Sequence, residues 1–291
     1  MENIEEMGSE HTELKPKLYL VPTPLGNLGD ITLRAKAVLE DVSEVYCEDT
    51  RNSLKLMNAL GIKKPMLSCH QHNEEQRAAE IFNKVSSGKA IAYISDAGMP
   101  GVSDPGSRLI RYFIEHGGEY EVLPGGTAAM TAWVMSGLPT DKLYFCGFLP
   151  RTGAERKQAI EQLKSIRATI VLYESPLRVG ETLNELVHAL GNFTCALVRE
   201  ISKYFEETVR GDAESLAKRF IETPPKGECV LVIDHNQSVR PDDDRDAEVL
   251  TMLLNAGCSC RDAAEIAGNL LNKPKNRMYK LALELSKNTE D

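Results

Sequence analysis

Six titratable side chains follow the ends of apolar runs that have the composition of β-strands. They are Asp49, Arg51, His70, Asp96, Glu200 and Lys203. A carboxylate or an imidazole in such a place can accept a proton from a weakly acidic group, and a cation can stabilise the charge that is left. Structural roles are equally open, since aspartates cap helices and loops and a histidine can be a polar residue at a strand end.

A loop rich in glycine and proline follows one of these runs. Its sequence, SDAGMPGVSDPG (95–106), has three glycines, which leave peptide groups uncovered, and two prolines, which stiffen the path. Related segments are VPTPLGNLGD (21–30), PGGTA (124–128), YESP (173–176) and PPKGE (224–228). Neither G-x-x-x-x-G-K-[ST] nor G-x-G-x-x-G occurs, which disfavours nucleotides and dinucleotides. Because loops at the carboxyl edge of a parallel sheet bind ligands, we expect a small polar organic ligand between two α/β domains.

The elements that position these loops alternate between strand and helix from residue 18 to residue 234. The predicted strands are 18–22, 44–47, 66–70, 89–95, 121–123, 143–148, 169–173, 194–199 and 228–234. Helix starts are predicted at Asp104-Pro105, at Ser175-Pro176 and at a capping box of Thr152 with Glu155. This alternation is typical of an α/β protein with largely parallel sheets.

The domain organisation follows from the same pattern. We predict an acidic disordered tail (1–16), an N-terminal α/β domain (17–137), a second α/β domain (138–235), a polar linker (236–245) and a helical module (246–291). Three short helices are expected in that module, over 247–254, 259–271 and 274–285.

Composition limits the class of protein. No apolar run approaches the roughly 20 residues that span a bilayer, and the acidic N-terminus is unlike a signal peptide. The seven cysteines are odd in number and lack a C-x-x-C pair, so we expect free thiols, a reducing cytosol and no metal site. Residues 1–17 and 240–248 together carry −6 of the net charge of −9, so the folded remainder can still present basic patches to a polyanion.

Several motifs, in order along the chain, resemble the tetrapyrrole methylase superfamily. They are VPTPLGNLGDITLRA, CEDTR (47–51), SDAGMPGVSDPG, PGGTA, GFLPR (147–151), YESPLR (173–178) and the stretch from Val198 to Glu207. Within that superfamily they are similar to the ribosomal small-subunit RNA (cytidine-2′-O)-methyltransferase branch. Met99 and the pair Gly126-Thr127 depart from the branch's usual residues.

This resemblance implies a tetrapyrrole methylase-like pair of α/β domains with S-adenosylmethionine folded in the cleft between them, and no metal. The family's cofactor contacts fall on Leu25, Ala97, Gly98, Met99, Val102, Thr127, Ala128, Glu174 and Glu228. Methyl transfer to a ribose hydroxyl needs positioning, and gains from a general base or a nearby cation. We predict Asp96 or Glu200 as the base, with Lys203 as a further catalytic residue.

Basic residues supply the predicted contacts to 16S ribosomal RNA within the small ribosomal subunit. They are Arg51, Arg151, Arg156, Arg178, Lys273, Lys275 and Arg277. The last three lie in a C-terminal segment that resembles a helix-turn-helix and could engage RNA backbone, or serve only for packing or dimerisation.

Two alternatives stay open at this point. One keeps the fold and cofactor but has a tetrapyrrole or another small acceptor; the other is a non-catalytic RNA-binding assembly factor. The resemblance also implies a homodimer, and we expect a cytoplasmic protein with no membrane partner.

Overall fold

The computed structural model describes residues 14–235 and 241–287, which form two compact units, one ending at Asp234 and the other beginning at His235. The predicted disordered tail therefore lies almost wholly outside the described residues, as does the first half of the predicted linker.

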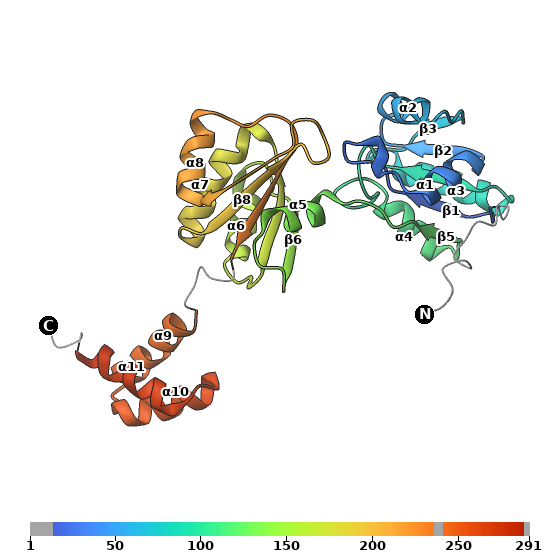
Figure 1. Cartoon of the computed structure of the whole chain (residues 1–291). Helices are drawn as coiled ribbons and strands as arrows, with labels where there is room; N and C mark the ends of the chain where they lie inside the picture. The colour runs from blue at the N-terminus through green and yellow to red at the C-terminus, as the bar shows by residue number, and fades with distance from the viewer. Residues whose placement is uncertain (1–13, 236–240, 288–291) are drawn as a thin grey trace, which may run out of the picture. The chain divides into compact units, whose positions relative to one another are not determined.

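The first sheet is entirely parallel. Its strands are β1 (Leu18–Val21), β2 (Glu44–Cys47), β3 (Met66–Ser68), β4 (Ile91–Ile94) and β5 (Tyr120–Val122), in the order β3-β2-β4-β1-β5 (Figure 1). All five were predicted within two residues at each end. In a parallel sheet every strand brings its following loop to one edge, so the loops after β1, β2 and β4 are neighbours.

Helices cover both faces of this sheet. Alternate strand residues pack with α1 (Leu33–Asp41) and α2 (Thr50–Ala59) on one face, and with α3 (Glu74–Ser86) and α4 (Ser107–Glu115) on the other. The alternation follows from the two-residue period of a strand, whose successive side chains point to opposite faces.

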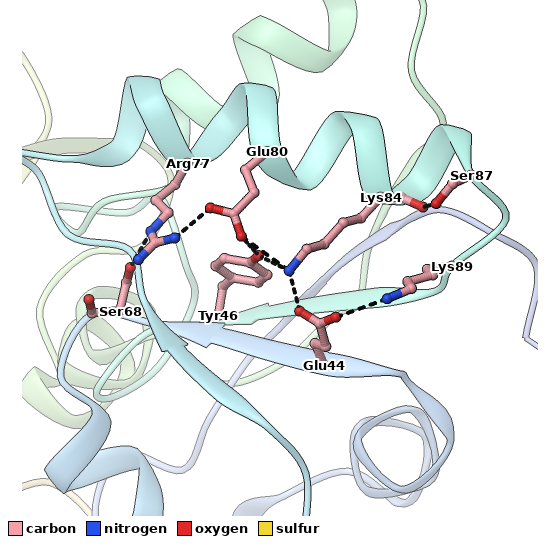
Figure 2. Close-up of polar contacts among 8 residues, drawn as sticks. All are labelled: Glu44, Tyr46, Ser68, Arg77, Glu80, Lys84, Ser87 and Lys89. Atoms are coloured by element: carbon pink, nitrogen blue, oxygen red, sulfur yellow. Dashed lines mark hydrogen bonds and ion pairs between the residues drawn. The ribbon is translucent and has the colours of Figure 1, made fainter.

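A polar network joins α3 to β2 (Figure 2). The Tyr46 hydroxyl donates to Glu80 Oε1 at 2.7 Å, Lys84 Nζ lies 3.1 Å from the same oxygen, and Lys84 also pairs with Glu44. Hydrogen bonds from Tyr46, Arg77 and Lys84 outweigh burial and lower the pKa of Glu80 to about 2, while burial raises the pKa of Tyr46 to about 12. The network fixes α3 in register on the sheet.

The second sheet is mixed, which corrects the prediction of largely parallel sheets. Its strands are β6 (Leu143–Phe148), β7 (Thr169–Glu174), β8 (Thr194–Arg199), β9 (Glu207–Asp212) and β10 (Cys229–Asp234), in the order β6-β7-β10-β8-β9. Only β6 and β7 pair in parallel; β10 runs antiparallel to both neighbours, and β8 to β9. The edge strand β9 was missed because its side chains are mostly half-exposed and its sequence is polar.

Helices also cover both faces of the second sheet. On one face lie α6 (Gly153–Leu163), α7 (Val179–Leu190) and α8 (Ala213–Glu222); α5 (Ala128–Ser136) packs on the other (Figure 1). Arg210 Nε on β9 donates to the Ser136 carbonyl at the end of α5 at 2.7 Å. The predicted boundary at residue 137 stays a prediction, but α5, which precedes it, packs against the second sheet.

Two short 3₁₀ helices, Leu28–Asp30 and Pro176–Arg178, lie in the loops after β1 and β7. At the predicted capping box, Thr152 is the N-cap of α6 but its side chain accepts no capping hydrogen bond. Ser175 precedes its 3₁₀ helix in the same way, without a side-chain cap.

The second unit is a bundle of α9 (Pro241–Asn255), α10 (Cys260–Leu271) and α11 (Lys275–Lys287). Its core consists of Leu250, Ala263, Ala264, Ala267, Met278 and Ala282, so small residues let the helices approach closely. The three predicted helices are present, although α9 begins six residues earlier than expected.

All seven cysteines are free, and four of them are buried: Cys47, Cys195 and Cys229 in strands, and Cys69 directly after β3. In the described part of the chain, no helix has the length and apolar character needed to cross a bilayer. Within the same ranges no three His, Cys, Asp or Glu side chains are placed to share a metal ion.

Candidate functional site

A cavity of about 400 Å³ lies among the loops of both sheets. It is lined by the loops after β1 and β4, by the start of α5, by the ends of β6 and β7 and by the start of β10. Its volume is within the roughly 300–1,000 Å³ typical of small-molecule sites. All nine residues predicted to contact a cofactor line it: Leu25, Ala97, Gly98, Met99, Val102, Thr127, Ala128, Glu174 and Glu228.

The loop after β4 is fixed by main-chain hydrogen bonds. The Gly98 amide donates to the Thr23 carbonyl, and the Thr23 amide donates to the Gly98 carbonyl, each at 3.0 Å. The buried Ser95 hydroxyl also donates to the Gly98 carbonyl at 3.0 Å, and the Thr23 hydroxyl donates to the Ser95 carbonyl at 3.1 Å. These contacts hold the backbone at the cavity wall in one conformation.

Any side chain at position 98 would strain the backbone and crowd the Leu25 side chain. Its φ is +77°, and a Cβ atom added there would lie 2.9 Å from Leu25 Cδ2, inside van der Waals contact. The cavity therefore has a cradle of bare main chain bordered by the Leu25 side chain.

The start of α5 and two aromatic rings form another wall. Thr127 caps α5, with its hydroxyl accepting from the Met130 amide at 3.3 Å. The Tyr173 hydroxyl accepts from the Ala129 amide at 3.2 Å, and the Phe148 ring contacts the Tyr173 ring edge to face, with the ring centroids 5.4 Å apart. The sequence analysis did not single out either ring.

Glu228, which lines the cavity, forms one hydrogen-bonded group with Glu200 and Lys203. Lys203 Nζ lies 3.0 Å from Glu200 Oε1 and 2.9 Å from Glu228 Oε2, and the Glu228 amide donates to Glu200 Oε1 at 3.0 Å. That amide and Lys203 together lower the pKa of Glu200. Neither Glu200 nor Lys203 lines the cavity. Both are hydrogen-bonded to Glu228, which does line it.

Glu174 is fully buried and its carboxylate is saturated with partners. Oε1 accepts from the Ser175 amide at 2.7 Å and pairs with Arg178 Nη2 at 2.6 Å, while Oε2 accepts from the Thr182 hydroxyl at 2.7 Å. It fixes the YESP turn at the cavity rather than offering a free oxygen.

Asp96 lines the cavity and accepts hydrogen bonds at its edge. Asn52 Nδ2 donates to Asp96 Oδ2 at 2.9 Å. Asp49 caps α2 and pairs with the exposed Arg51 at 2.7 Å, which lowers the pKa of Asp49 to about 2. Asp49, Arg51 and His70 do not line the cavity.

Asp104 also lines the cavity, which sequence reasoning missed. The predicted cap at Asp104 is wrong: α4 begins at Ser107, and the buried carboxylate of Glu74 accepts from the Gly106 and Leu109 amides at 2.9 and 3.0 Å. Burial and the charges of Glu48, Asp96 and Glu228 raise the pKa of Asp104 to about 7. The only signal available was the second aspartate of the SDAGMPGVSDPG segment.

Arg151, Arg156 and Arg178 line a second groove, of about 650 Å³, between α6 and α7. Lys157 and Lys164 border it as well. Arg156 is a correction to the predicted RNA contacts: its side chain is 8% exposed, and it pairs with Glu185 at 2.7 Å and bonds Thr182 at 2.8 Å. It therefore supports the protein interior instead of meeting a phosphate at the surface.

In the C-terminal unit, Arg277 lies 3.4 Å from the buried carboxylate of Asp246, and Lys275 pairs with Glu265. Lys273 follows α10 and is half-buried. Lys275 and Arg277, both predicted as RNA contacts, thus also make ion pairs within their own unit.

A model of the tetrapyrrole (corrin/porphyrin) methylases matches residues 17–217. The chain is 41% identical over 230 residues to ribosomal RNA small subunit methyltransferase I of Halalkalibacterium halodurans, covering 79% of this chain and 80% of that protein. The protein of the same name from Bacillus subtilis is 38% identical over 269 residues, covering 90% and 92%. Among solved structures, uroporphyrin-III C-methyl transferase from Thermus thermophilus, complexed with S-adenyl homocysteine, superposes with a TM-score of 0.56 at 18% identity, covering 77% of this chain and 99% of that one.

Proposed function

The chain belongs to the tetrapyrrole methylase family, and we propose that it transfers a methyl group from S-adenosylmethionine to the 2′-oxygen of a cytidine in 16S ribosomal RNA of the small ribosomal subunit. The observation that carries this proposal is the convergence on one cavity of nine predicted residues from five separate segments of the chain.

The cavity fits the cofactor by its shape and its chemistry. The absence of a side chain at Gly98, whose own amide and carbonyl bond Thr23, lets an adenosine or an amino acid approach the main chain closely, and Leu25, Met99 and Val102 supply apolar contact. A Cβ at position 98 would meet the Leu25 side chain, as expected of a wall already at contact distance. When bound there, S-adenosylmethionine supplies an activated methyl group, so this chain's residues need mainly to orient the two reactants.

Ribosomal RNA as acceptor is supported by the relatives' printed names and by the basic groove between α6 and α7. Arg151 and Lys157 lie in that groove, where they can contact phosphate groups, while Lys164 beside them pairs with Glu161 at 2.8 Å. Lys273 and Lys275 add basic charge on the C-terminal unit. A tetrapyrrole acceptor is favoured only by fold-level likeness at low identity, which carries no substrate information.

The direct test uses purified protein, S-adenosylmethionine labelled in its methyl group, and small ribosomal subunits from a strain lacking this ribose methylation. We expect label on a cytidine ribose of 16S RNA and none on large subunits or on uroporphyrinogen. Label on a base or on uroporphyrinogen, or no label in any acceptor, would contradict the proposal. Calorimetry with S-adenosylhomocysteine separates a missing acceptor from a protein that does not bind the cofactor.

A homodimer and a cytoplasmic location complete the proposal. Light scattering of the full-length chain tests the first, with a mass of twice 32.2 kDa expected. Cell fractionation tests the second.

A further inference from the structure

The carboxylate of Asp104 is held at the cavity wall by a constrained turn. Ser103 before it has a φ of +61°, a left-handed conformation that is unfavourable for a non-glycine residue and is found at functional sites. Pro105 after it restricts the backbone of Asp104. The Gly101 amide donates to the Pro105 carbonyl at 3.1 Å and closes the turn.

Among the acids that line the cavity, Asp104 differs in its bonding. Glu174 has both oxygens occupied, Glu228 is bonded to Lys203, and Asp96 accepts from Asn52. For Asp104, no hydrogen bond or ion pair joins its carboxylate to another residue in the described ranges. It is therefore the lining acid whose oxygens are available to a bound reactant.

The surroundings of Asp104 are acidic. Glu48 after β2, Asp96 after β4 and Glu228 before β10 face it with negative charge, and Tyr93 and Tyr173 lie within electrostatic range. Lys203, which pairs with Glu228, is also engaged by Glu200. With burial, these charges bring the pKa of Asp104 to about 7, where a carboxylate is a stronger base than usual and is still half ionised at neutral pH.

We propose that Asp104 is the general base that accepts the proton of the acceptor hydroxyl. The inference rests on the proposed function. The ribose 2′-oxygen attacks the methyl carbon and forms the O–C bond while the C–S bond breaks, and that bond's electron pair goes to the sulfonium sulfur, giving a neutral thioether. The hydroxyl proton passes to an oxygen of Asp104 and leaves to solvent after the product departs. Asp96 and Glu200, the bases predicted from the sequence, are engaged in hydrogen bonds to Asn52 and to Lys203.

The test measures single-turnover methylation of small subunits lacking the modification, from pH 5.5 to 9, for the wild type, Asp104→Asn and Glu48→Gln. For the wild type we expect a rate that rises with pH through about 7 and then levels off. Asp104→Asn should lose about 10²–10⁴-fold in rate, the usual contribution of a general base, while S-adenosylhomocysteine affinity by calorimetry stays within about threefold. Glu48→Gln removes a neighbouring negative charge, so the rising limb should move to lower pH.

A second readout needs no turnover. Carbon-13 spectra of aspartate carboxyl groups in the wild type should contain one resonance that titrates near 7 and is absent in Asp104→Asn. If the wild type labels 16S RNA and Asp104→Asn does so at a similar rate, Asp104 is not the base, while the proposed function stands. A wild type that labels no ribose would overturn the proposed function, whatever Asp104 does. If Asp104→Asn does not fold, two other results still refute the inference. One is a methylation rate that rises with pH over the same range in Glu48→Gln as in the wild type. The other is a wild type without an aspartate carboxyl resonance that titrates near pH 7.

Discussion

Replacing Gly98 by alanine tests the main-chain cradle most directly. The left-handed φ of +77° makes any side chain there cost roughly 1–2 kcal/mol of folding free energy. The new Cβ would also lie 2.9 Å from Leu25 Cδ2, so the Leu25 side chain must move along the cavity wall. Full burial of a leucine side chain contributes about 1.5–3 kcal/mol. If the displaced Leu25 loses half of its contact with the ligand, the upper end of this range corresponds to an affinity about tenfold weaker.

Gly117→Ala is the matched control. Gly117 has a φ of +67°, and an added Cβ meets nothing within 4 Å, so this variant carries the backbone strain without the contact. Calorimetry with S-adenosylhomocysteine and urea denaturation should show similar losses of stability for both variants and about tenfold weaker binding for Gly98→Ala alone. Equal affinities in the two variants would refute the idea that the loop at Gly98 forms the ligand cradle.

Three further outcomes are expected. Glu174→Gln removes a buried partner of Arg178 and should lower the free energy of unfolding, measured by urea denaturation, by about 3–5 kcal/mol. Glu185→Gln, at a half-exposed carboxylate, should lower it by less than about 1 kcal/mol. Similar losses in the two variants would contradict the buried role of Glu174. Because the pKa of Glu80 is about 2 when folded against an ordinary 4.5, its stabilisation is complete above pH 4.5 and is lost as pH falls toward 2. Because a third of the Glu80 side chain is exposed, we discount its contribution to about 1 kcal/mol. The difference in the free energy of unfolding between the wild type and Glu80→Gln should therefore narrow between pH 4.5 and 2. A constant difference would refute the low pKa of Glu80. Lys273→Gln with Lys275→Gln should flatten the salt dependence of RNA binding by about 0.7–0.9 per lost phosphate contact and leave S-adenosylhomocysteine affinity unchanged; an unaltered slope would assign those lysines to packing.

The sequence by itself determined most strands and the loops that line the cavity. Buried strands such as β2 and β8 have continuous apolar runs, and glycine and proline mark the loop at Gly98 because few other residues adopt its backbone path. These are local properties, so they can be read from neighbouring residues.

Strand direction and the partners of each carboxylate were decided by the tertiary structure. The antiparallel placement of β10 depends on pairing with β7 and β8, the strands on either side of it, which lie thirty or more residues away in sequence. A local pattern carries no direction. Asp96 and Asp104 are the same residue type in one loop, yet Asn52 bonds the first, while burial and three distant acids act on the second. Coulomb interactions and desolvation depend on distance in space, so only the folded chain distinguishes the two.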